Sequence, residues 1–332
     1  MKYQKITLVF PGQGAQMPGM GKELHDKYKS AKDVYTRASE ILRYDITKIC
    51  FGDKSIVGKL KKFFMGDALN RTLYVQPAIL TTSYASLRAL EERCGESNIS
   101  LRPYLVMGHS FGEYTALIAS GATDFETALK LVQRRAELMT EALATYTNTG
   151  LMVVIIPEKT KGSEERIKNL CEENHVNIAL INSPDQIVVG GPKKNLEKMT
   201  KALKGKMRTI MVGGAEGAFH TGIMESAAKK FKPYIEGSDF YISPIPIIAN
   251  VTAQAIADPA HIRDELYYQV YNPVNWRDSV QKAIENGADL FIEVGPGKVL
   301  SGMLERINPK IARLNVDNLE SLEKTVQELA KE

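Results

Sequence analysis

The stretch Val106-Met107-Gly108-His109-Ser110-Phe111-Gly112-Glu113-Tyr114 predicts the turn that organises the fold. The preceding run, residues 104–108, is expected to be a buried strand, and residues 112–120 a helix. A strand, Gly-x-Ser-x-Gly and a helix in this order are typical of a nucleophile elbow, a strained turn that exposes a serine at the top of a sheet. Gly108 and Gly112 satisfy its need for small neighbours. The alternative is a turn that uses small residues only for packing.

If the turn is an elbow, Ser110 is the nucleophile and needs a base. The side chain of His109 diverges from that of Ser110 on such a turn, so we interpret it as a structural neighbour. Three of the other four histidines lie in polar helical or loop segments: His25, His175 and His261. His220 is the remaining candidate, because it follows the inserted unit where the chain re-enters the large domain, and loops carry catalytic groups. The alternative for His220 is a loop histidine held by a backbone contact.

Composition narrows the class of protein. The 332 residues, 44% apolar and 25% charged, predict a globular protein with one large core and a smaller unit attached or inserted. The net charge is +4, and Lys and Arg are scattered along the chain. This distribution argues against nucleic acid as a ligand and suits an acidic protein partner. Three distant cysteines predict free thiols in a reducing compartment, and therefore a cytoplasmic protein. No apolar run approaches ~20 residues, so we expect no membrane contact.

The order of elements predicts an α/β protein interrupted by a second unit. A strand is expected at 5–10, helical segments at 21–50 and 124–144, and a helix over 76–93 that begins at Pro77. The middle of the chain then reads β-α-β-β-α-β, a ferredoxin-like unit. Its expected strands and helices are 151–156, 162–174, 176–182, 186–191, 193–204 and 207–213. The earlier alternation then resumes, with expected elements at 245–250, 278–286, 289–295 and 318–332.

Three further stretches complete a pattern: FPGQGAQ (10–16), LVQRRAELM (131–139) and EVGPGKVL (293–300). Together with GHSFGEYTAL and AFH, they make the chain resemble the malonyl-CoA:acyl carrier protein transacylase family, which includes polyketide synthase acyltransferases. The resemblance covers roughly residues 5–315. It implies an α/β-hydrolase-like large domain with an inserted ferredoxin-like small domain. The expected boundaries are 1–145 and 214–318 for the large catalytic domain, 146–213 for the small domain, and 319–332 for a C-terminal helix.

The resemblance also implies roles for single residues. Ser110 matches the nucleophile and His220 the base. No acidic residue stands out as a third triad member, and the family orients its histidine with a main-chain carbonyl, which here matches that of Asn275. The backbone N–H groups of Gln13 and Phe111 match the oxyanion hole.

Arg135 matches the arginine that pairs with the free carboxylate of the malonyl group. A fork-shaped guanidinium suits this task, because it binds a carboxylate through two parallel hydrogen bonds. The alternative for Arg135 is a solvated helix arginine like Arg134. Gln76 matches a pocket glutamine of the family. Phe219 matches an aromatic residue that accompanies malonyl selectivity, and its bulk would crowd an α-methyl branch.

The implied reaction moves malonyl from CoA to the phosphopantetheine thiol of an acyl carrier protein, in fatty acid or polyketide synthesis. It runs through malonyl-Ser110 with ping-pong kinetics and needs no metal or bound cofactor. The alternative is a hydrolase that releases acyl groups from carrier proteins. We expect a monomer whose partners are malonyl-CoA and an acidic carrier protein. Two basic groups are candidate docking faces, or else plain solvated faces: Lys59, Lys61 and Lys62, or Lys229, Lys230 and Lys232.

Overall fold

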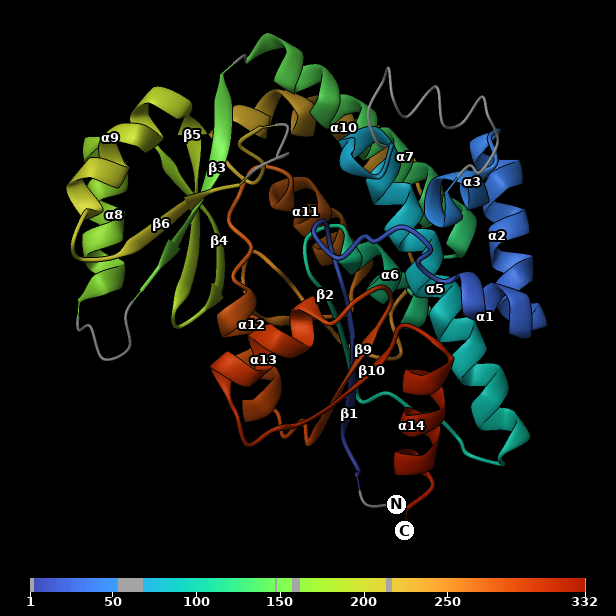
Figure 1. The fold of residues 1–332 in the computed structure, drawn as a ribbon. Coiled ribbons are helices and arrows are strands. Elements are labelled where there is room, and N and C mark those ends of the chain that lie inside the picture. The colour runs from blue at the N-terminus through green and yellow to red at the C-terminus, as the bar shows by residue number, and fades with distance from the viewer. Residues whose placement is uncertain (1–2, 53–67, 147, 157–161, 213–216, 332) are drawn as a thin grey trace.

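Two β-sheets organise the chain (Figure 1). The computed structural model describes residues 3–52, 68–146, 148–156, 162–212 and 217–331. Its larger sheet has six strands in the order β10-β9-β1-β2-β7-β8, and its smaller sheet has four in the order β4-β5-β3-β6. The first candidate docking group, Lys59, Lys61 and Lys62, lies outside the described residues.

The larger sheet is parallel except for its last strand, β8, which runs antiparallel to β7. Its strands are β1 (Ile6–Phe10), β2 (Leu105–Gly108), β7 (Ile247–Ile248), β8 (Ala255–Ile256), β9 (Leu290–Val294) and β10 (Ala312–Val316). Every residue of β1, β2 and β9 is buried, as expected for parallel strands covered on both faces. Successive residues of β1 pack on opposite faces of the sheet. Leu8 belongs to one hydrophobic core, and Val9 belongs to another that also contains Trp276.

Helices cover both faces of this sheet (Figure 1). In the first half of the chain they are α1 (Lys22–Lys27), α2 (Lys29–Leu42), α3 (Ile46–Phe51), the 3₁₀ turn η1 (Ala68–Asn70), α5 (Thr72–Glu96), α6 (Gly112–Ala119) and α7 (Phe125–Thr145). In the second half they are η2 (Gly222–Met224), α10 (Glu225–Glu236), α11 (Pro259–Gln269), α12 (Trp276–Glu285), α13 (Val299–Ile307) and α14 (Leu319–Leu329). None of the helices in these described ranges is long and apolar enough to cross a membrane.

The smaller sheet is antiparallel and has a core of its own. Its elements are β3 (Thr149–Ile155), α8 (Ser163–Glu173), β4 (Asn177–Ser183), β5 (Gln186–Pro192), α9 (Lys193–Leu203) and β6 (Arg208–Met211). Met152 and Val154 of β3 pack in that core with Ile167 of α8 and Leu196 of α9. Val153 faces the other way and lines a cavity against the larger sheet. The strand order and the two helices are those of a ferredoxin-like unit.

The predicted fold class, an α/β-hydrolase-like domain with an inserted ferredoxin-like unit, is confirmed; the exact domain boundaries stay a prediction. Several element predictions need correction. α5 begins at Thr72, so Pro77 lies inside the helix instead of at its start. The expected strand 245–250 is reduced to Ile247–Ile248, because Pro244 and Pro246 have no N–H for a ladder.

Candidate active site

Ser110 lies on a strained turn between β2 and α6. Its φ is 54°, in the left-handed region that side chains rarely adopt. A Cβ added to Gly108 would lie 2.0 Å from the carbonyl carbon of Gly112, and one added to Gly112 would lie 2.3 Å from the backbone oxygen of Phe10. Both glycines are therefore required by backbone contacts, which is the close approach that the motif predicts.

Ser110 faces His220 across the cavity. The Ser110 Oγ lies 2.7 Å from Nε2 of His220, and the other ring nitrogen, Nδ1, lies 2.8 Å from the backbone oxygen of Gln269. Because a carbonyl only accepts, Nδ1 carries the hydrogen, and the lone pair of Nε2 points at the serine hydroxyl. Burial, and then the charge of Arg135, lower the pKa of His220 to about 3, so the ring is neutral at pH 7. A neutral imidazole in this tautomer can take the serine proton.

The prediction that the carbonyl of Asn275 orients this histidine is wrong. That carbonyl accepts from the backbone N–H and the hydroxyl of Ser279, 2.9 Å and 3.0 Å away, because Asn275 is the N-cap of α12. Gln269 supplies the carbonyl instead. It is the last residue of α11, where backbone oxygens have no partner within the helix and are available to other donors.

The backbone N–H groups of Gln13 and Phe111 are available for an oxyanion. Both residues line the cavity beside Ser110, and within the described residues neither N–H donates to a protein acceptor. Phe111 is the N-cap of α6, where N–H groups lack partners within the helix. The loop that holds Gln13 packs directly on the serine turn, since a Cβ on Gly12 would lie 2.4 Å from the oxygen of His109.

Arg135 is a buried cation with neutral neighbours. It is 1% exposed, and its NH1 and NH2 groups donate to Gln76 Oε1 at 2.8 Å, Gln269 Oε1 at 3.2 Å and Ser110 Oγ at 3.3 Å. Its Nε has no partner, and no carboxylate within the described ranges forms an ion pair with it. Burial lowers the pKa of Arg135, but a guanidinium starts high enough to stay charged. An anionic group in the cavity would meet an unneutralised cation.

The cavity between the two sheets holds about 290 Å³. Its polar wall comes from the larger sheet and adjoining helices, and its apolar wall from the face of the smaller sheet that α8 and α9 leave uncovered. Phe219, 7% exposed, lies in the lining next to His220. The lining residues are Gln13, Gly14, Gln16, Gln76, His109, Ser110, Phe111, Arg135, Met139, Leu151, Val153, Leu180, Val188, Val212, Phe219 and His220.

Sequence reasoning missed the side chains that hold the serine turn. Asn250 Oδ1 accepts from the Ser110 N–H at 2.7 Å, and Gln269 Nε2 donates to the Ser110 oxygen at 2.9 Å. The NH2 groups of Asn250 and Gln269 also donate to the carboxyl group of Glu113. These bonds set the orientation of both side-chain amides toward the serine turn. Burial, and then the nearby Glu265, raise the pKa of Glu113 well above its usual range. The one feature of the sequence that could have indicated this role is that Glu113 directly follows the Gly-x-Ser-x-Gly motif.

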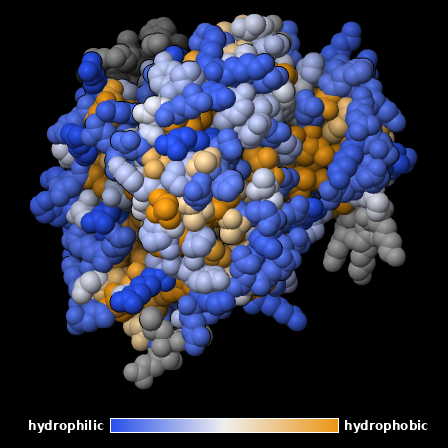
Figure 2. All heavy atoms as spheres, turned by 180° about the vertical axis from the view of Figure 1, so that it is seen from behind, coloured by the Kyte–Doolittle hydropathy of each residue, from blue (hydrophilic) through white to orange (hydrophobic). Residues whose placement is uncertain are grey.

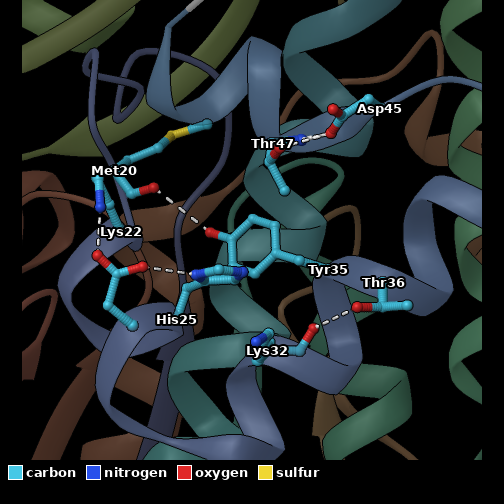
Figure 3. A network of polar contacts seen from close by, with 9 residues as sticks. Met20, Lys22, His25, Lys32, Tyr35, Thr36, Asp45 and Thr47 are labelled. Carbon is cyan, nitrogen blue, oxygen red and sulfur yellow. Dashed lines mark hydrogen bonds and ion pairs between the residues drawn. The ribbon is translucent and has the colours of Figure 1, made fainter.

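His109 and His25 both have contacts that account for them without a role in the reaction. His109 lines the cavity, but its Nε2 lies 3.0 Å from Asn182 Oδ1 on β4 and its ring meets the edge of Trp276. His25, expected to be solvated, instead packs against Tyr35 at a ring distance of 5.5 Å. Figure 3 shows this neighbourhood, in which the Tyr35 hydroxyl donates to the backbone of Met20 and so supports the chain that follows the Gln13 loop.

The glycine-rich run Gly295-Pro296-Gly297-Lys298 forms a tight turn after the strand β9. Gly295 has a φ of 137°, and a Cβ there would lie 2.3 Å from the hydroxyl of Ser83. The buried Glu293 carboxylate accepts from the backbone of Leu300 and Ser301, at 3.0 Å and 2.7 Å, and caps α13. The turn therefore joins β9 to α13, and the carboxylate of Glu293 already occupies the N–H groups at the start of that helix.

The comparisons with known proteins agree with this geometry. The model of the acyl transferase domain family matches residues 7–320. A curated relative, the malonyl CoA-acyl carrier protein transacylase of Bacillus subtilis, is 36% identical over 99% of this chain and 98% of its own length. The chain therefore belongs to the acyl transferase domain family. Within it, the curated relatives at 34–36% identity place the chain in the malonyl CoA-acyl carrier protein transacylase family.

Solved structures give the same assignment. The malonyl CoA-acyl carrier protein transacylase of Clostridium perfringens aligns with a TM-score of 0.86 at 35% identity, covering 98% of this chain and 97% of that one. A malonyl-transacylase solved in complex with a type II polyketide synthase acyl-carrier protein aligns with a TM-score of 0.85 at 31% identity, covering 98% of this chain and all of that one (100%).

Proposed function

We propose that this chain transfers the malonyl group from malonyl-CoA to the phosphopantetheine thiol of an acyl carrier protein, through an ester on Ser110. The observation that carries the proposal is the buried, unneutralised Arg135 whose NH2 group lies 3.3 Å from the nucleophile oxygen. A cation in this position suits an acyl group that ends in a carboxylate. It offers nothing to a simple acyl ester, so the hydrolase alternative is not favoured, and the relatives are named transacylases.

In the first half-reaction, Nε2 of His220 takes the hydroxyl proton while Ser110 Oγ attacks the thioester carbonyl. The N–H groups of Gln13 and Phe111 donate to the oxyanion of the tetrahedral intermediate. The C–S bond then breaks, and the leaving CoA sulfur receives the proton from His220. Malonyl-Ser110 remains, with its free carboxylate on Arg135.

In the second half-reaction, the phosphopantetheine thiol gives its proton to Nε2 of His220, and its sulfur attacks the ester carbonyl. The ester C–O bond breaks, and the proton returns from His220 to Ser110 Oγ. Because both acyl transfers use the same groups, the enzyme alternates between two forms with ping-pong kinetics. The reaction needs no bound cofactor, and malonyl-CoA enters as a substrate.

The carboxylate of the acyl group also helps the base. The charge of Arg135 is the second cause, after burial, of the low pKa of His220. A malonyl carboxylate paired with Arg135 cancels that charge, so the pKa of His220 rises when a carboxylated substrate is in place. Gln76 holds the other guanidinium NH group at 2.8 Å and keeps the fork in the cavity. Phe219 narrows the cavity beside the ester and disfavours an α-branched acyl group.

Intact-mass measurement tests the proposal. Wild-type protein is mixed with malonyl-CoA and, separately, with acetyl-CoA, and Ser110→Ala is the control. We expect a malonyl adduct on wild type, a weaker acetyl adduct, and no adduct on Ser110→Ala. A stronger acetyl adduct, or rapid CoA release without any adduct, would contradict the proposal and favour a hydrolase.

A further inference from the structure

β6 carries three consecutive exposed apolar residues. Ile210, Met211 and Val212 are 40%, 42% and 37% exposed, and the hydrogen bond from the Val212 N–H to Leu151 continues the strand to that residue. β6 lies at the end of the strand order, and among the described residues it pairs with β3 alone, so no described strand covers its outer edge. Natural proteins usually cover or charge such an edge, and an exposed apolar one indicates a binding surface.

This strip leads into the candidate active site. Val212 lines the cavity, as do Leu151 and Val153 of β3. Ile210 is the register partner of Val153, so the two side chains lie on the face of the sheet that borders the cavity. Met211 is the partner of Met152 and lies on the opposite face, beside Lys193, so the strip surrounds the outer edge of β6. Figure 2 shows the molecule from behind, with an open hydrophobic area on the side that carries the four-stranded sheet. A partner seated on the strip is therefore next to the cavity mouth.

Basic residues flank the strip. The segment 193–208, from α9 to β6, contains one acidic residue, Glu197, and seven exposed basic ones: Lys193, Lys194, Lys198, Lys201, Lys204, Lys206 and Arg208. None of the seven forms an ion pair with any residue that the structure describes. Lys193 lies next to the strip. A Cβ added to Gly150 would be 3.6 Å from the Cε of Lys193 and 3.8 Å from the Cε of Met211, so both side chains border the same point.

The basic group predicted from the sequence on α10 differs from this segment. Lys229 pairs with Glu225 at 2.9 Å, Lys230 with Glu141 at 2.5 Å, and Lys232 lies 3.7 Å from Glu236. Each charge there is neutralised by a neighbour, so α10 presents little positive field to a partner. The basic residues of 193–208 form no ion pair with a described residue, so this segment keeps its positive field.

We propose that Lys193, Lys194, Arg208, Ile210, Met211 and Val212 form the docking surface for the acidic carrier protein that accepts the acyl group. The proposal rests on the proposed function, which needs a thiol on a protein-bound arm to enter the cavity. The apolar strip gives the partner a surface to bury next to the cavity mouth. The unpaired cations attract its carboxylates and orient it before contact.

The test separates the two half-reactions. The variant Lys193→Glu/Lys194→Glu is compared with wild type, and Lys229→Glu/Lys230→Glu on α10 is the matched control. Malonyl-enzyme is formed first from malonyl-CoA and then mixed with a holo acyl carrier protein or with free pantetheine. We expect the α9 variant to raise the KM for the carrier protein roughly tenfold at low salt. Adduct formation and transfer to pantetheine stay at the wild-type rate, and the α10 variant behaves as wild type.

A second variant probes the apolar strip without changing charge. Ile210→Ser, on the face of the sheet that carries Val153, is expected to raise the KM for the carrier protein and to leave transfer to pantetheine unchanged. An equal KM in wild type and the α9 variant, an equal effect of the α9 and α10 variants, or a parallel loss with pantetheine would overturn the docking proposal. Failure of wild type to form any malonyl adduct would instead overturn the proposed function.

Discussion

Replacing Arg135 by methionine tests the selection of a carboxylated acyl group. The change removes the charge and keeps a side chain of similar length. Among the described residues the guanidinium donates hydrogen bonds only to neutral groups, on Gln76, Gln269 and Ser110, and its Nε has no partner there. Loss of the cation therefore breaks no ion pair within the described protein, and its effect falls on the substrate.

The magnitude follows from the bond that is lost. A hydrogen-bonded contact to a charged group contributes about 1.5–3 kcal/mol. We therefore expect kcat/KM for malonyl-CoA to fall by about 10- to 150-fold. Acetyl-CoA has no carboxylate, so its kcat/KM changes little, and the preference for malonyl over acetyl falls by nearly the same factor. Because a buried unpaired charge is replaced by an apolar group, the melting temperature stays the same or rises.

The assay follows CoA release and adduct mass for both acyl-CoA substrates. Arg134→Met is the matched control, because Arg134 is adjacent in sequence but only half-buried and pairs with Glu137 at 2.9 Å. It should leave both rates unchanged. An equal loss with malonyl-CoA and acetyl-CoA would show that Arg135 acts on the serine turn and does not recognise the carboxylate, and would refute the reasoning.

Five further outcomes are expected, three for stability and two for pH dependence. Glu113→Gln replaces one of the two carboxyl oxygens that accept from Asn250 and Gln269 by an NH2 donor, so one of these amides loses its acceptor; the change should cost about 1–3 kcal/mol in chemical denaturation together with a lower kcat. Gly112→Ala places a Cβ 2.3 Å from a backbone oxygen and should destabilise by about 3 kcal/mol or more. Gly302→Ala, in α13 with nothing within 4 Å of its Cβ, should stabilise by about 0.5–1 kcal/mol. Because the pKa of His220 is lowered to about 3, labelling of the serine by a neutral phosphonate should stay constant from pH 8 down to about pH 5. In Arg135→Met the pKa of His220 rises, so the acid limb should move to higher pH; an unchanged limb would contradict the electrostatic coupling.

Much of the fold could be predicted because its central strands are continuous apolar runs. The runs before Pro11 and before Gly108 are buried strands, and the β-α-β-β-α-β rhythm of 149–211 is complete. The serine turn was predictable as well, since its two glycines are required by backbone contacts that no other residue allows.

The predictions failed where the site itself breaks the hydrophobic pattern. The inward face of α11 contains Ile262, Glu265, Leu266 and Gln269, so half of it is polar and its periodicity does not indicate a helix. Those polar residues hold Val251 and the serine turn by hydrogen bonds. The family resemblance placed the carbonyl that orients His220 on Asn275, six residues after Gln269, and no predicted helix end was there to indicate the free carbonyl of Gln269.

The position of the inserted unit has a consequence for synthesis of the chain. Ser110 lies before the smaller sheet in sequence, whereas His220, Asn250 and Gln269 all follow it, and β9 must pair beside β1. The ferredoxin-like unit pairs locally and can form while the ribosome still holds the rest. Strand pairings across such long separations form slowly. The nascent chain therefore carries its serine through the synthesis of the whole inserted unit without the groups that hold it, and gains a working centre only when the last third has emerged.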